Sequence, residues 1–97
     1  MADIEIATRV VEPVAAEEFF ALGMNYSAGV GVPVDLIEAH KWFNIAAMRG
    51  HADAARLRRE IAEQMADAEI GTAQRAARAW IKEHPQPQAP VAILAAA

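Results

Sequence analysis

Three histidines, His40, His51 and His84, are the side chains in this sequence best suited to binding a metal or moving protons. No two of them have the i, i+4 spacing that places two imidazoles on one face of a helix. The chain also has no cysteine to complete a tetrahedral site. The pattern therefore predicts no metal centre and no cofactor, and it favours packing or surface roles for these imidazoles.

Nucleophilic and acid–base chemistry has equally few candidates. Ser27 is the only serine, and it lies in an expected turn outside any Gly-x-Ser-x-Gly context. The GVGV stretch at 29–32 lacks the Gly-Lys-Ser/Thr that completes a phosphate-binding loop. Glu17 and Glu18 are adjacent and point in different directions around a helix, which does not favour an acid–base couple. We therefore predict a protein that is not an enzyme and has no catalytic residues.

Basic side chains in the second half of the chain form a candidate docking face. They are Arg56, Arg59, Arg75, Arg78 and Lys82. Two interpretations stay open: a solvated helix face with i, i+4 pairs such as Arg59–Glu63, or a docking face for an acidic partner. Nucleic acid is a poor partner, because the net charge is −4 and few aromatic side chains are available to stack on bases.

Turn signals divide the middle of the chain into four expected helices. The first covers 13–27, from Pro13 to the glycine-rich GVGVP turn. The second begins at about Leu36, behind Asp35 and Glu38 in a capping pattern, and stops at Gly50. The third covers about 52–65 and the fourth 67–83, after which the prolines of PQPQAP end helical structure.

The 97 residues fit one small domain. We expect a flexible arm at 1–12, a helical domain at 13–84, and a Pro-rich spacer with an exposed hydrophobic tail at 85–97. The charge is −6 over residues 1–40 and +2 over 41–97, a polarity that suits a protein partner. A secretory signal and an apolar run of roughly 20 residues are both lacking, so a cytoplasmic location and no membrane contact are expected.

A repeat is visible when Glu18–Tyr26 is aligned with Asp53–Ile61, with Leu22 falling on Leu57. The sequence around its first copy resembles the Sel-one-like repeat family, relatives of the tetratricopeptide repeats. The matching positions are Leu22, Gly23, Tyr26, Gly29, Gly31, Val32, Asp35, Ala39, Trp42, Ala46, Ala47, Gly50 and Ala54. They cover less than half of the chain, and Arg58 breaks the second copy because it replaces the glycine found at Gly23.

This resemblance implies an all-α fold: a short α-solenoid of about four helices, with one full Sel-one-like repeat, a half repeat and a capping helix. Gly23 would allow close helix approach, and Gly29 and Gly31 would take the positive φ of a tight turn. So few repeats bury little surface, so weak self-association is also expected. Proteins of this family serve as adaptors, and the resemblance implies no catalysis.

The last seven residues carry no charged side chain: Val91, Ala92, Ile93, Leu94, Ala95, Ala96 and Ala97. Three interpretations stay open: the tail packs into a groove of its own domain or a neighbouring subunit, it is inert, or a partner binds it. In the third interpretation, the tail is similar to the apolar tags that AAA+ proteases bind. It predicts an adaptor or allosteric regulator of such a protease, Lon first and ClpXP second, with a role as substrate left open. The alternative is a repeat scaffold that binds a signalling partner's peptide in a groove lined by Tyr26, Trp42 and Phe43.

Overall fold

The computed structural model describes residues 15–85, and helices are the only regular secondary structure within them. Four helices follow one another: α2 (Ala16–Ala28), α3 (Leu36–Met48), α4 (Ala54–Ala62) and α5 (Asp67–Glu83). The all-α prediction is confirmed. The expected arm at 1–12 and most of the expected spacer and tail lie outside the described residues.

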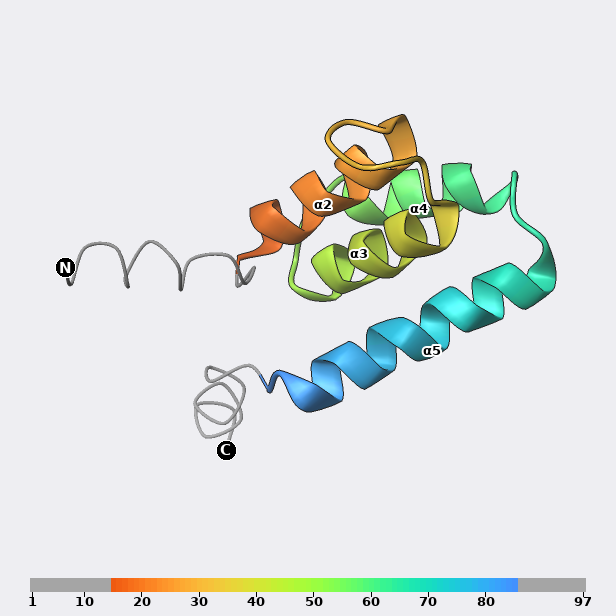
Figure 1. The fold of residues 1–97 in the computed structure, drawn as a ribbon. Coiled ribbons are helices and arrows are strands. Elements are labelled where there is room, and N and C mark those ends of the chain that lie inside the picture. Colours follow the sequence, from red (N-terminus) through yellow and green to blue (C-terminus); the bar gives the residue numbers. More distant parts are fainter. Residues whose placement is uncertain (1–14, 86–97) are drawn as a thin grey trace, which may run out of the picture.

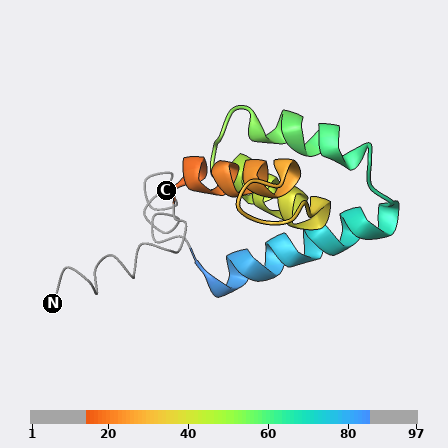
Figure 2. The ribbon, with the colours of Figure 1, turned by 45° about the horizontal axis from the view of Figure 1, so that its top comes forward.

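Helix α3 is the central element, and the other helices pack around it (Figures 1 and 2). It lies against α2, α4 and α5, whereas α4 and α5 make few contacts with each other. In a regular solenoid several repeats stack, and each contacts only its neighbours, which four helices around α3 do not show. The solenoid arrangement therefore stays a prediction, and what the structure has is a small bundle centred on α3.

The sequence of α3 explains its central position. Its apolar and small residues occur on nearly every side, so the helix buries Ala39, Trp42, Phe43, Ile45 and Ala46. A helix that is apolar around most of its circumference is stable only when it is surrounded. Two groups of core residues result: one joins α3 to α2 and α5 around Phe19 and Trp42, and the other joins it to α4 and α5 around Phe43.

Close approach of α2 and α3 depends on a glycine. A Cβ built on Gly23 would lie 2.5 Å from the ring of Phe43, far inside van der Waals contact. Phe43 is 1% exposed and Phe19 is fully buried, so neither ring has free space to move into. The prediction that Gly23 permits close helix packing is confirmed.

The helix starts follow side-chain caps. The N–H of Glu38 donates to Oδ1 of Asp35 at 3.1 Å, which confirms the predicted start of α3. The first helix was expected from Pro13, but α2 begins at Ala16, since Oε1 of Glu18 accepts from the N–H of Ala15 at 2.9 Å. Helix α5 has the predicted bounds, and the N–H of Ala66 donates to Glu69 in the same way.

The helix ends follow glycines and tight turns. Gly29 and Gly31 both have φ of +77°, as predicted. Gly50 has φ of +96°, and the N–H of His51 donates to the carbonyl of Ala46 at 2.9 Å, the signature of a Schellman end. The third helix was expected over 52–65 but covers only Ala54–Ala62, because the chain tightens there into i→i−3 hydrogen bonds such as Met65 N–H to Ala62 O.

Candidate functional site

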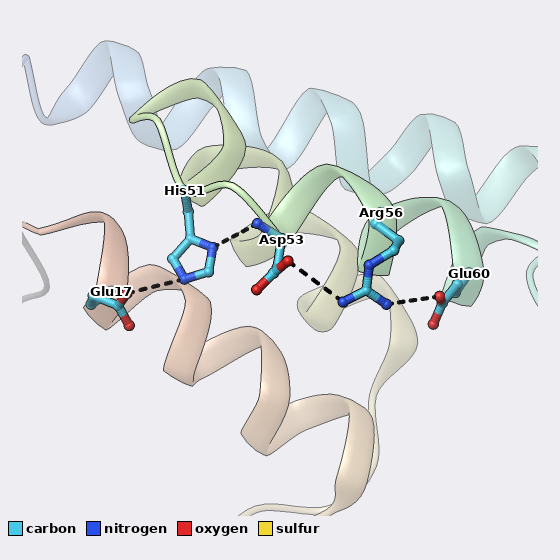
Figure 3. A network of polar contacts seen from close by, with 5 residues as sticks. All are labelled: Glu17, His51, Asp53, Arg56 and Glu60. Carbon is cyan, nitrogen blue, oxygen red and sulfur yellow. Dashed lines mark hydrogen bonds and ion pairs between the residues drawn. The ribbon is translucent and has the colours of Figure 1, made fainter.

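A polar network crosses the junction between the start of α2 and the α3–α4 turn (Figure 3). Nε2 of His51 lies 3.2 Å from Oε2 of Glu17, and Nδ1 of His51 accepts from the N–H of Asp53 at 3.2 Å. An acceptor role at Nδ1 places the proton of the neutral imidazole on Nε2, which then donates to Glu17. The Schellman end at Gly50 places His51 in this position. The contacts of His51 with Glu17 and Asp53 therefore connect α2 to the chain entering α4.

The imidazole of His51 also covers the core. Its ring stacks on Phe20 with centroids 3.9 Å apart and planes 9° apart. Phe20 in turn packs against both core groups. Sequence reasoning missed this contact, which joins residues 31 positions apart that no local pattern connects. The geometry gives His51 a structural role: it closes the apolar interior at one corner.

The same network continues along the outer face of α4 as paired charges. Arg56 lies 3.6 Å from Asp53 and 3.1 Å from Glu60, and all three side chains are exposed (Figure 3). The i, i+4 ion pair was expected between Arg59 and Glu63. Within residues 15–85 the ion pairs of α4 are instead those of Arg56, with Glu60 at i, i+4 and with Asp53 at i, i−3. This face of α4 is therefore a solvated helix face with alternating charges.

Aromatic rings join α2, α3 and α5 near the end of α5. Trp80 meets Phe19 edge-on at 5.1 Å and Trp42 edge-on at 5.6 Å. His84 stacks on Trp80 at 4.0 Å, and its Nδ1 lies 2.9 Å from the carbonyl oxygen of Trp80. These contacts fix the last turn of α5 beside the first turn of α2, so both ends of the described chain lie at the same end of the molecule (Figures 1 and 2).

Two cations, one in α3 and one directly after it, lie over these rings. Nζ of Lys41 is 4.2 Å from the ring centre of Trp42, and the guanidinium of Arg49 is 5.4 Å from that of Phe19. Glu38 accepts a hydrogen bond from Nε1 of Trp42 at 3.0 Å and pairs with Lys41 at 3.6 Å. Glu38 was expected to complete a capping pattern with Asp35, and its side chain instead contacts two residues of α3.

His40 is the buried titratable group of the described chain. It is 3% exposed, and its Nδ1 has no hydrogen-bond partner among residues 15–85. Burial lowers the pKa of His40, and the positive charge of Arg58 lowers it further. Arg58 is held by a 2.6 Å hydrogen bond to Oδ1 of Asn44. The residue that broke the sequence repeat thus joins α4 to α3.

The residues proposed as a groove do not form an open surface. Trp42 is 8% exposed and Phe43 is 1% exposed, while Tyr26 is half-buried against both core groups. These rings fill the space between helices, because α5 covers Trp42 and α2 covers Phe43. Neither Trp42 nor Phe43 is accessible to a partner's peptide in this structure. This corrects the expected groove.

The predicted basic docking face divides between two helices that do not pack closely. Arg56 and Arg59 lie on α4, and the remaining cations Arg75, Arg78 and Lys82 lie on α5. All five are exposed. Arg56 is occupied by two acids, whereas no ion pair involves the cations of α5 within residues 15–85.

In the part of the chain that the structure describes, no three His, Cys, Asp or Glu side chains gather closely enough to hold a metal ion. Among those residues there is likewise no helix with the length and apolar character needed to cross a membrane. The tail residues Val91–Ala97 lie outside the described range.

No family model, curated protein or solved structure matches this chain.

Proposed function

We propose that this chain is a non-enzymatic protein–protein interaction module, an adaptor or allosteric regulator of a bacterial AAA+ protease in the cytoplasm. Lon is the first candidate and ClpXP the second, and the contact is made by the apolar segment Val91–Ala97. In the same contact the chain also serves as a substrate. The Sel-one-like resemblance supports the adaptor role, and it remains part of the proposal.

One observation carries this proposal: the described helices supply both core groups from their own residues. Phe19, Trp42, Phe43 and Ile45 are buried by side chains of α2 to α5. The apolar side chains of Val91, Ile93 and Leu94 follow a helical unit whose large rings already have partners. An apolar segment that follows a helical unit with a core of its own is a candidate partner-binding site, since contiguous apolar patches often mark such sites.

The position of α5 supports the same proposal. His84 and Trp80 hold its last turn against α2 and α3, and Pro85 follows directly. The chain that leads to the segment thus leaves a fixed point of the molecule at Pro85. Fixing one end of a binding segment lowers the entropy that it loses on binding.

The test removes residues 91–97 and measures binding to purified Lon and purified ClpXP, together with thermal unfolding followed by circular dichroism. We expect binding to be lost while the midpoint of unfolding stays within about 2 °C, since residues of α2 to α5 and the loops between them make up both core groups. A matched control replaces Val91, Ile93 and Leu94 by serine in the full-length chain, which keeps the length and removes only apolar surface.

Two results would overturn the proposal. If unfolding moves to a much lower temperature, the segment belongs to the core of this protein. If neither protease binds the intact chain, the scaffold alternative gains, in which a signalling partner's peptide binds the helical surface and the tail is packed or inert.

A further inference from the structure

The outer face of α5 carries a row of cations that the proposed function leaves unused. Arg75, Arg78 and Lys82 follow one another at spacings of three and four residues, which places them on one face of the helix. The buried residues of α5, Ala73 and Ala77, lie on the opposite face. We define Arg75, Arg78 and Lys82 as the α5 cationic row.

This row differs from an ordinary solvated helix face. On α4 the outward charges alternate, and Arg56 is paired with Asp53 and Glu60. On α5 the neighbours at i, i+3 and i, i+4 are like charges, which repel and destabilise a helix. No member of the row has an ion pair within residues 15–85, and the one hydrogen bond of Arg75 is to the hydroxyl of Thr72 at 3.3 Å.

The row lies on the helix that precedes the proposed binding segment in the chain. Its members lie within about 10 Å along the helix axis, at a rise of about 1.5 Å per residue. The six residue steps from Pro85 to Val91 reach at most about 20 Å when fully extended. The row and the start of the segment are therefore close enough in the chain to contact one partner, whose standard interface buries about 800 Å² per partner.

We propose that the α5 cationic row docks on an acidic surface of the partner that takes the segment Val91–Ala97. This inference rests on the proposed function. The apolar segment supplies most of the affinity, and the cations steer association and orient α5. A repulsive row without acids of its own on the described chain is complementary to acids on a second protein.

The test compares two variants with the same change in net charge. R75Q/R78Q removes two cations from α5, and R56Q/R59Q removes two from α4. Association and dissociation rates with purified Lon are measured by stopped flow between low and physiological salt. We expect the α5 variant to associate about tenfold more slowly at low salt and to lose most of its salt dependence, with little change in dissociation. The α4 variant should change association much less, and R75K/R78K should behave as the unmodified chain.

Equal effects of the two glutamine variants, or no effect of either, would overturn the row as a docking surface. If the α5 variants have no effect while deletion of 91–97 abolishes binding, this inference fails and the proposed function stands. If intact protein does not bind Lon, both fail. The chain's own acidic residues 1–14 are the rival occupant. If deletion of residues 1–14 shifts the amide NMR signals of Arg75, Arg78 and Lys82, the row binds that acidic segment and the partner is excluded. A salt-sensitive dimer in sedimentation that R75Q/R78Q dissolves would assign it to a second copy.

Discussion

Gly23 shows how a single hydrogen atom in place of a side chain decides the distance between two helices. We expect Gly23→Ala to lower the free energy of unfolding by about 1–3 kcal/mol, because the new Cβ would overlap the ring of Phe43 and neither helix can yield freely. Urea unfolding followed by circular dichroism measures the change.

Gly71 supplies a matched control on α5. A Cβ there meets only the guanidinium end of Arg75 at 3.3 Å, which is flexible and exposed. Gly71→Ala should raise the free energy of unfolding by up to about 1 kcal/mol, the difference in helix propensity. Destabilisation of similar size in both variants would contradict this account of Gly23.

His40 makes stability depend on pH in a defined direction. Burial and Arg58 lower the pKa of His40 in the folded protein, so the unfolded chain binds a proton first as the pH falls. The contribution of the neutral imidazole is complete above the unfolded pKa of about 6.5 and is lost as the pH drops below it. The slope is at most about 1.4 kcal/mol per pH unit for one proton.

His40→Met isolates this contribution, since it keeps a similar apolar volume and removes the titrating group. We expect stability of the unmodified protein to fall more steeply between pH 6.5 and 5 than that of the variant, in urea unfolding at each pH. An NMR titration that places the pKa of His40 above 6.5 would refute the assignment.

At the scale of the helix, repulsion between like charges lowers the stability of α5, and one substitution can remove it. Arg78→Glu replaces two like-charge pairs by attractive ones, with Arg75 at i, i+3 and Lys82 at i, i+4. The free energy of unfolding should rise by about 1 kcal/mol. Thermal unfolding at low and high salt checks this, because added salt should shrink the gain.

Charge reversal at a solvated site of α4 provides the comparison. Arg56→Glu breaks attractive pairs with Asp53 and Glu60 and should lower the free energy of unfolding by a similar amount. The prediction for α5 is wrong if both reversals destabilise the protein equally.

Helix positions were largely predictable because their signals are local. Asp35 caps α3 through a residue three positions away, and Gly50 ends it through its own φ. The shortened α4 was not predictable, since its last turn tightens between Ala62 and Met65 without a glycine or proline to mark it. The start of α2 was predicted from Pro13, but the helix begins at Ala16, because the side chain of Glu18 caps it at Ala15.

At the scale of the whole molecule, contacts between distant residues set the limit of sequence reasoning. The resemblance to a repeat implied a capping helix at this position, without saying where it packs, and α5 packs mainly on α3. Trp80 is the physical reason, because its ring meets Phe19 and Trp42 rather than a residue of α4. Periodicity indicates which face of a helix is apolar, but it does not say which helix will cover that face.

Truncation after Met65 distinguishes a bundle from a solenoid. Without α5, the chain loses Ala73, Ala77 and Trp80 from its two core groups. We expect the truncated chain to lose its cooperative unfolding transition in circular dichroism, because α3 would be uncovered along one side. In a solenoid, stability is close to a sum over neighbouring units, and α2 to α4 would keep a cooperative transition. Retention of that transition would contradict the bundle interpretation.

The meeting of Trp42 and Trp80 has an optical consequence. They are the only two tryptophans of the chain, and their rings lie 5.6 Å apart at 75° across the contact between α3 and α5. Indoles this close couple electronically and give a paired signal in circular dichroism, which disappears when α5 separates from α3. Because the imidazole of His84 stacks on Trp80, the emission of that indole should also respond to movement of the last turn of α5. The protein thus carries its own fluorescent reporter at the point where its chain leaves the last helix.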